Sequence, residues 1–267
     1  MIDPLRFYRV RGWGRKLPFT RFLGYPLLGM AVGPKEALPS FPFLLFLVDG
    51  LVVSSILAFS YALNDYFDFV LEGESNYVGE CLKSGRLSHR KTLFLILLPL
   101  FFFPLSLLLP FPVFLLLFLF LGLSSLYSLP RVRMDRRPLP KFLLSPFSAF
   151  ILTLQALLLS NNLSSLCLGL LLVVFLFHYY ANSFHYLEEG GEWKDCLRFF
   201  PLLSFSFSLL LSFFLSPLFL LTASFSLLRY SGVRKGDFFA MRSKLFGPPL
   251  FSEEFLVYAF LGMMGIL

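Results

Sequence analysis

Residues 61–74, with the sequence YALNDYFDFVLEGE, place an Asn and a group of carboxylates at the end of a long apolar run. Asp65, Asp68 and Glu72 stand at i, i+3 and i+7, so at about 100° per residue they fall within about 60° of one another on a helix. Carboxylates on one face repel each other, which lowers stability unless a cation lies between them. The stretch therefore predicts a helix with a cation site at its end. Exposure of the acids to solvent beside basic loops is the alternative explanation.

The composition around this stretch is that of a membrane protein. The 267 residues are 57% hydrophobic, include 37 Phe and have a mean hydropathy of +0.76, whereas soluble domains average about 45–50% apolar even with Gly counted. A formal net charge of +7 could indicate a nucleic-acid partner, but the charges lie between the apolar runs, as membrane anchors do. We therefore expect membrane lipids as partners and no nucleic acid.

The apolar runs predict an all-α, polytopic helical bundle of about nine transmembrane helices in a single domain over residues 1–267. Several runs are shorter than the roughly 20 residues of a full span, which favours short or tilted helices. Eight spans with a re-entrant piece is the alternative, because two spans must fit between Arg198 and Arg229. The expected spans are residues 18–33, 41–63, 92–109, 111–127, 142–160, 164–187, 199–214, 217–229 and 249–267.

The basic residues predict the orientation of this bundle. All of the 23 Lys and Arg residues except Lys35 lie in the N-terminal segment or in the loops that follow even-numbered spans. By the positive-inside rule the N-terminus, including the basic segment 1–17, is cytoplasmic. We expect a multi-pass protein of the cell membrane. An N-terminal signal peptide in residues 1–33 is disfavoured, because the basic region is long and no A-x-A site follows.

A second stretch, NSFHYLEEGGEWKD at residues 182–195, repeats the acidic spacing with His185, Glu188 and Glu192. Both sets stand at the cytoplasmic ends of predicted spans, so they face the same side of the membrane. Mg²⁺ takes few carboxylates, keeps waters and bridges to substrate phosphates. Two facing clusters therefore predict a site for a metal-bound diphosphate, although the paired glycines after Glu189 make the second helix less certain.

Two basic loops could supply the remaining anion contacts. KSGRLSHRK at residues 83–91 follows the first acidic set, and LYSLPRVRMDRRPLPK covers residues 126–141. Arg forks suit phosphate oxygens, and topology anchoring beside lipid headgroups is the alternative role.

These stretches together resemble the UbiA superfamily of intramembrane prenyltransferases. Residues 63–74 (LNDYFDFVLEGE), 82–88 (LKSGRLS) and 126–139 (LYSLPRVRMDRRPL) are similar to its N-D-x-x-D-x-x-x-D motif, its S-G-R-L-S loop and its Y-S-x-P-P-x-R-x-K segment. The second acidic stretch is similar to its D-x-x-D-x-E-G-D motif. The order of the motifs over residues 64–192 and the nine-span topology also agree.

The resemblance implies roles for individual residues. The metal ligands that it implies for this chain are Asp65, Asp68, Glu72, Glu188, Glu192 and His185. Of these, Asp65, Asp68, Glu188 and Glu192 are implied to be catalytic. Its substrate-binding residues are Asn64, Arg86, Tyr127 and Arg133, joined by Arg136, Arg137 and Lys194 as replacements for basic residues of the family.

Some positions depart from the family pattern. Tyr77 and Asp135 stand where the family has basic residues, and Glu replaces Asp at three ligand positions. His185 stands where the second motif has its first Asp, and a His ligand suits Mn²⁺ better than Mg²⁺.

The resemblance implies an enzyme that moves a prenyl group from an isoprenyl diphosphate to a lipophilic acceptor, with Mg²⁺ as cofactor and an active site facing the cytoplasm. A quinone precursor, a prenylglycerol phosphate and a tetrapyrrole are acceptors within the family. A family member that binds prenyl lipids without turnover is one alternative. A membrane transporter is another, although transporters place ionisable ligands near the bilayer midplane.

Two ionisable residues lie well away from the ends of predicted spans. Asp49 lies within residues 41–63, and His178 within residues 164–187. Ionisable groups within a membrane are candidates for function. A neutral hydrogen-bonded acid and a packing His are the alternatives.

Overall fold

The computed structural model describes residues 2–10, 41–130, 138–160 and 200–214, with single positions at 171, 217, 220, 223, 224 and 227. Every element within these residues is helical, as predicted. The predicted spans at 18–33 and 249–267, nearly all of the span at 164–187 and most of the span at 217–229 lie outside the described residues. The count of nine spans and the cytoplasmic N-terminus remain predictions.

The elements are α1 (Pro4–Phe7), α3 (Phe41–Glu72), α4 (Tyr77–Lys83), α5 (His89–Leu97), the 3₁₀ helix η2 (Leu98–Leu108), α6 (Phe111–Ser128), α7 (Pro138–Leu159) and α10 (Phe200–Phe214).

Helix α3 carries the acidic stretch beyond the membrane span predicted for residues 41–63. Its 32 residues reach about 48 Å at 1.5 Å per residue, against a hydrocarbon core of about 30 Å. The acids therefore occupy the last turns of the same helix. Gly73 ends the helix with a φ of 70°, a left-handed conformation that glycine adopts without a steric penalty.

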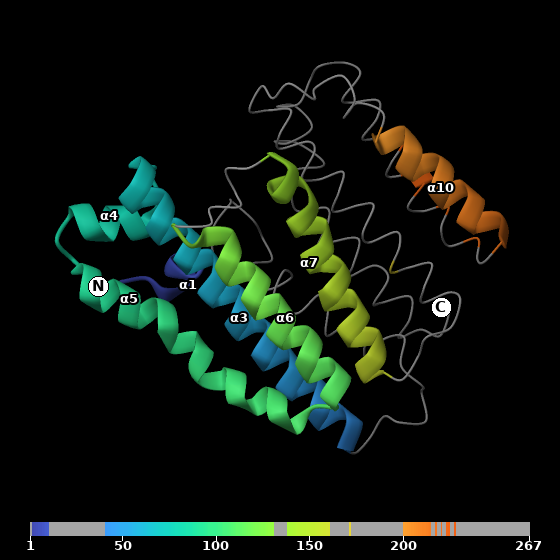
Figure 1. Cartoon of the computed structure of the whole chain (residues 1–267), viewed down its shortest axis with the longest axis horizontal. Coiled ribbons are helices and arrows are strands. Elements are labelled where there is room, and N and C mark those ends of the chain that lie inside the picture. Colours follow the sequence, from blue (N-terminus) through green and yellow to red (C-terminus); the bar gives the residue numbers. More distant parts are fainter. Residues whose placement is uncertain are drawn as a thin grey trace.

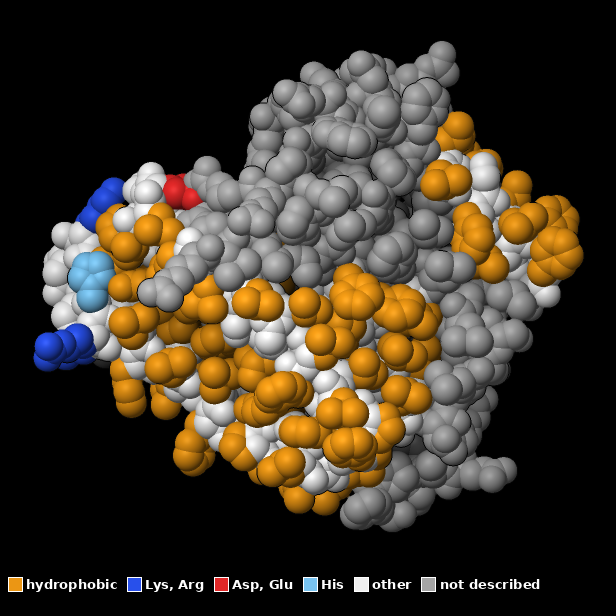
Figure 2. Space-filling view, viewed as in Figure 1, with side chains coloured by type: hydrophobic (Ala, Val, Ile, Leu, Met, Phe, Trp, Pro, Cys, Tyr) orange, Lys and Arg blue, Asp and Glu red, His pale blue; other side chains and the backbone are white. Residues whose placement is uncertain are grey.

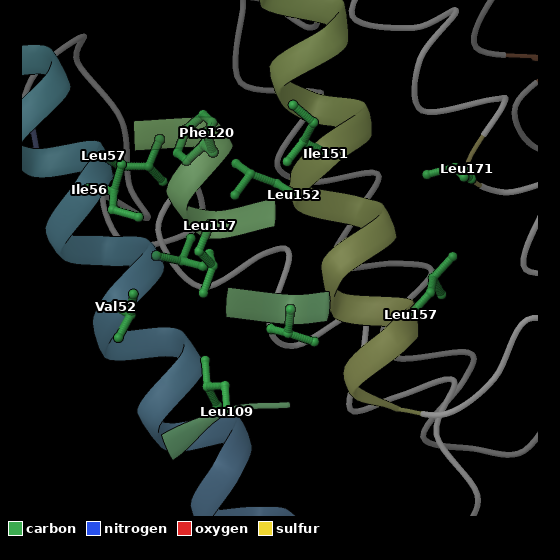
Figure 3. Packing of buried hydrophobic residues seen from close by; sticks show 12 residues of the cluster. Val52, Ile56, Leu57, Leu109, Leu117, Phe120, Ile151, Leu152, Leu157 and Leu171 are labelled. Carbon is green, nitrogen blue, oxygen red and sulfur yellow. The ribbon is translucent and has the colours of Figure 1, made fainter. Parts of the chain in front are cut away.

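The bundle is built around α3, which packs against η2 and α6, while α6 packs against α7. Figure 1 shows α3, α6 and α7 running alongside one another, with α5 and η2 following one edge of this group. The contact is a layer of interlocking apolar side chains from the three helices (Figure 3). Its buried members include Val52, Ile56 and Leu57 of α3, Leu117 and Phe120 of α6, and Ile151, Leu152 and Leu157 of α7.

The span predicted for residues 92–109 differs from expectation in its geometry. An α-helix begins at His89, where the Ser88 side chain accepts a hydrogen bond from the Lys91 N–H, and it changes to a 3₁₀ helix at Leu98. Pro99 and Pro104 lack the N–H that would continue the α-helical ladder.

The 3₁₀ geometry sorts the η2 side chains into straight rows, because residues at i and i+3 eclipse one another. One row is exposed and another is buried or packed on the core. The segment therefore presents one apolar ridge to the bundle and another outward. The exposed row is Leu98, Phe101, Pro104 and Leu107, and the inner row is Leu100, Phe103, Ser106 and Leu109.

The outer face of the bundle is apolar. Phe101 is 80% exposed and Phe118 is 59% exposed, and Figure 2 shows apolar side chains covering this face, with Lys and Arg at one edge. Three described helices are long and apolar enough to cross a membrane: Leu44–Glu72, His89–Leu108 and Phe111–Ser128. An apolar surface of this kind over helices of this length is typical of a protein that lies in lipid. The chain is a multi-pass membrane protein.

A second apolar cluster fixes the acidic end of α3. It joins the end of α3 to α1, α4 and α5. Packing of these short elements positions the polar residues described below. Its buried members are Phe7, Phe59, Ala62, Leu63, Tyr66, Val78, Cys81, Leu87 and Ile96.

Candidate functional site

The acidic end of α3 holds two buried carboxylates. Asp65 is 2% exposed and Asp68 is 9% exposed, while Glu72 is half-buried at the last helical position. The stretch is helical through Glu72, so the predicted i, i+3, i+7 spacing on one face is confirmed. A buried carboxylate is costly unless cations or hydrogen-bond donors compensate it.

Arg9 compensates Asp65. Its Nε donates a hydrogen bond to Asp65 Oδ2 at 3.0 Å, and its Nη2 donates to Oδ1. This two-bonded arrangement is the strong form of an arginine–carboxylate pair. Burial acts to lower the pKa of the Arg9 guanidinium, but the hydrogen bond and the charge of Asp65 outweigh it and raise that pKa above its ordinary value. Arg9 therefore stays cationic.

The backbone of Arg9 is in an unfavourable conformation. Its φ is 52°, and it is the one described residue other than glycine with a positive φ. The left-handed region costs a residue with a side chain roughly 1–2 kcal/mol. The surrounding contacts must offset this cost, and the strained residue itself contributes the pair with Asp65 and a contact of its guanidinium with the Tyr61 ring at 5.8 Å.

The segment before Arg9 is attached at Tyr77 of α4. The backbone N–H of Asp3 donates to Tyr77 Oη at 2.8 Å, and the Arg6 guanidinium stands over the Tyr77 ring at 4.4 Å. Asp3 also caps α1 by accepting from the Leu5 N–H at 3.0 Å. Tyr77 thus holds a segment that brings Arg6 and Arg9 to this end of the molecule. In the family that the sequence resembles, the position of Tyr77 is basic.

A further anchor of the segment lies on α5. The Tyr8 hydroxyl donates to the Leu95 carbonyl oxygen at 2.7 Å, and burial raises the pKa of that hydroxyl. Phe7 is buried in the second apolar cluster. Residues 2–10 are therefore folded onto α3, α4 and α5.

Asp68 is held by a different set of partners. The Asn64 side-chain amide donates to Asp68 Oδ2, and the Asn64 amide oxygen accepts from Ser128 Oγ at 3.3 Å. Asn64 therefore links the first acidic motif to the end of α6, where the predicted substrate-binding residue Tyr127 lies half-buried beside Ser128. The acidic stretch at residues 61–74 and the start of the basic stretch at residues 126–141 are therefore in contact.

Helix α4 is locked against α3 by a polar cap and a close apolar contact. Asn76 donates from its amide to the Asp65 carbonyl oxygen at 2.9 Å and accepts from the Gly79 N–H at 2.8 Å. A Cβ at Gly79 would lie 2.4 Å from the Phe69 ring. Only glycine lets the two helices approach this closely.

The loop with the sequence SGRLS connects α4 to α5. Gly85 makes the turn with a φ of 68°, Leu87 is buried, and Ser88 caps α5. Arg86 is exposed and forms no ion pair with any described residue. The structure therefore explains the glycine, the leucine and the second serine as structural residues and leaves a substrate role for Arg86 as a prediction.

The other predicted site residues lie outside the described residues. Among the described residues, no three His, Cys, Asp or Glu side chains converge as a metal site. The acids of α3 would thus need further ligands. The predicted residues that cannot be placed are His185, Glu188, Glu192, Arg133, Arg136, Arg137 and Lys194.

Sequence reasoning missed Arg9. The six basic residues of the N-terminal segment served only as indicators of topology, because nothing in the sequence shows which of them folds back. The available signal was indirect: the family's basic residue is absent at Tyr77, so another cation was to be expected near the acids.

The UbiA prenyltransferase family matches residues 23–189 of the chain. The chain therefore belongs to this family, as the motifs predicted. No curated protein sequence matches the chain.

Solved structures share the fold over nearly the whole length. A UbiA homologue from Archaeoglobus fulgidus bound to DMAPP and Mg²⁺ has a TM-score of 0.67 at 13% identity, covering 98% of this chain and 99% of that one. The same homologue bound to GPP and Mg²⁺ gives 0.68 at 13% identity, covering 98% and 96%. A structure of digeranylgeranylglyceryl phosphate synthase gives 0.63 at 14% identity, covering 98% and 95%. At such identities the likeness establishes the fold.

Proposed function

We propose that the chain is an intramembrane prenyltransferase that moves a prenyl group from an isoprenyl diphosphate to a lipophilic acceptor, with the diphosphate bound at the acidic end of α3. One observation carries the proposal. Asp65 and Asp68 lie buried together at a helix end in a member of the UbiA prenyltransferase family, and Asn64 links Asp68 to the end of α6. A quinone precursor or a prenylglycerol phosphate is the proposed class of acceptor.

The donor set fits Mg²⁺. Carboxylate oxygens are its preferred protein ligands, and it is usually held by one or two carboxylates together with waters and substrate phosphates. Asp65 and Asp68 would hold it from α3, with Glu72, Glu188 and Glu192 as the other proposed oxygen ligands and His185 favouring Mn²⁺. When bound, the metal would neutralise charge on the departing diphosphate. The related homologue solved with DMAPP or GPP and Mg²⁺ supports this choice.

Residues of the chain would meet the other requirements of prenyl transfer, which are orientation of the metal ligands and exclusion of water. Asn64 and Ser128 fix the direction in which Asp68 presents its oxygens. The apolar bundle keeps water from the allylic carbon while its C–O bond breaks and the diphosphate departs with the electron pair. The acceptor nucleophile then bonds to that carbon and loses a proton. The proposed site faces the cytoplasm, where charged diphosphates are dissolved.

The test uses full-length protein in lipid nanodiscs with radiolabelled farnesyl or geranylgeranyl diphosphate. Mg²⁺ or Mn²⁺ is supplied with a panel of lipophilic acceptors, and diphosphate release and labelled product are measured. We expect metal-dependent transfer that falls about 100-fold or more in Asp68→Asn, with Glu80→Gln, an exposed acid of α4, as the matched control.

Three outcomes separate the alternatives. Transfer to one acceptor class supports the enzyme and identifies its substrate. Metal-dependent binding without release under any acceptor supports a family member that binds prenyl lipids without turnover. Absence of both binding and release would contradict the proposal.

A further inference from the structure

The acid that the proposed function requires as a metal ligand is already paired with a cation of the same chain. Arg9 donates to both carboxylate oxygens of Asp65. A divalent ion at Asp65 needs at least one of those oxygens and is repelled by a guanidinium beside it. The metal and Arg9 therefore compete for one carboxylate.

The competing guanidinium belongs to a segment with defined attachment points. The Asp3 N–H donates a hydrogen bond to the Tyr77 hydroxyl, and the Arg6 guanidinium stacks on the Tyr77 ring. The Tyr8 hydroxyl donates to the Leu95 carbonyl oxygen. Phe7 adds an apolar contact with the second cluster, and α1 is a single turn of four residues. Isolated helices this short do not persist on their own, so the segment depends on its docking contacts.

The strain at Arg9 couples the pair to the backbone. The positive φ of Arg9 is an unfavourable state, and the bidentate pair with Asp65 lies at that same residue. Loss of the pair would remove a force that holds this conformation, and the backbone could then relax. Breaking one contact would thus loosen the end of the segment.

We propose that residues 2–10 form a latch that docks on the acidic end of α3 when no metal is bound and is displaced when a divalent metal binds Asp65. In this arrangement Arg9 is a positioning residue that sets the metal affinity of the site. The proposal rests on the proposed function, because it takes Asp65 as a metal ligand.

The first test uses the wild-type protein and needs no substitution. Hydrogen–deuterium exchange of residues 2–10 is measured with and without saturating Mn²⁺ alone, at matched ionic strength. The amides of Phe7, Tyr8 and Arg9 donate to backbone carbonyls within the segment, so we expect their exchange to rise at least severalfold when metal binds. Unchanged exchange at metal saturation would overturn the latch.

The second test measures Mn²⁺ affinity by electron paramagnetic resonance. We expect Arg9→Ala to bind Mn²⁺ at least tenfold more tightly than wild type, because a charge-assisted pair no longer competes. Arg9→Lys, which cannot form the two-bonded fork, should lie between them. The matched control is Arg90→Ala, which removes an exposed Arg from the start of α5 and should leave the affinity within about twofold.

The results distinguish the latch from the metal site itself. Equal or weaker Mn²⁺ binding in Arg9→Ala would overturn the latch while leaving the metal site intact. Absence of Mn²⁺ binding in both wild type and Arg9→Ala would overturn the metal site and the latch together. Thermal unfolding in the same nanodiscs checks that each variant is folded.

Discussion

Helix α3 buries an acid near each of its ends and treats the two acids differently. Asp65 receives two hydrogen bonds from a guanidinium, and its backbone oxygen receives a third from Asn76. Asp49, about 24 Å away along the axis, receives one bond of 3.3 Å from Gln155 Nε2. Within the described part of the chain, Asp49 Oδ1 and Gln155 Oε1 have no hydrogen-bond partner.

The difference shows that burial of an acid does not by itself indicate a site. At the Asp65 end, short elements from distant parts of the sequence converge and supply charge, donors and a cap. At the Asp49 end, one neighbouring helix supplies one amide. Unsatisfied buried polar atoms lower stability, so burial of Asp49 is expected to destabilise the fold. An Asp→Asn substitution should therefore act differently at the two ends of the helix.

The largest effect is expected for Asp65→Asn. The amide keeps the size of the side chain but loses the negative charge that both Arg9 and a metal require. We expect metal-dependent diphosphate binding to weaken about 100-fold or more, measured with radiolabelled diphosphate in nanodiscs. The control is Asp49→Asn, the same change on the same helix. Equal loss in both variants would contradict the assignment of the site to one end.

An intermediate effect is expected for Ser128→Ala. This change removes the donor to the Asn64 amide oxygen, so a half-buried acceptor loses this partner and Asp68 is less well oriented. We expect kcat/KM to fall about tenfold. Ser125→Ala is the matched control, because Ser125 Oγ donates back to the Leu121 carbonyl of its own helix. If the two serine variants behaved alike, the link between α3 and α6 would have no role in the reaction.

The smallest effect is expected for Asp49→Asn on its own. An amide at this position can still accept from Gln155 Nε2, and it can also donate to the unpaired Gln155 Oε1. We expect prenyl transfer within about twofold of wild type and stability raised by roughly 1 kcal/mol, measured by thermal unfolding in nanodiscs. A marked loss of transfer would show that this end also takes part in function.

The sequence was sufficient for the features that depend on local spacing. The helical placement of Asp65, Asp68 and Glu72 followed from a repeat of three and four residues, and family membership followed from the order of four motifs. The junction of Asn64 with Ser128 could be anticipated only through the family, because it joins residues from separate helices.

The pairing of Arg9 with Asp65 could not be predicted in this way. The two residues are 56 positions apart, and the positive-inside rule accounts for every basic residue of the N-terminal segment without a contact. The 3₁₀ geometry of η2 was also missed, because both helix types show the same run of apolar residues when one face meets lipid. Its prolines were the local signal, since each removes a backbone donor.

The 3₁₀ geometry of η2 has a consequence for how the length of this segment could change in related chains. Each residue turns the helix by about 120° and advances it by about 2.0 Å, so three residues complete a turn. Loss or gain of three residues would keep the Leu100, Phe103 and Ser106 row facing the bundle and alter the span by about 6 Å. Loss of a single residue would rotate the outward Phe101 ridge away from lipid. Insertions and deletions in this segment of related chains are therefore expected to come in multiples of three residues.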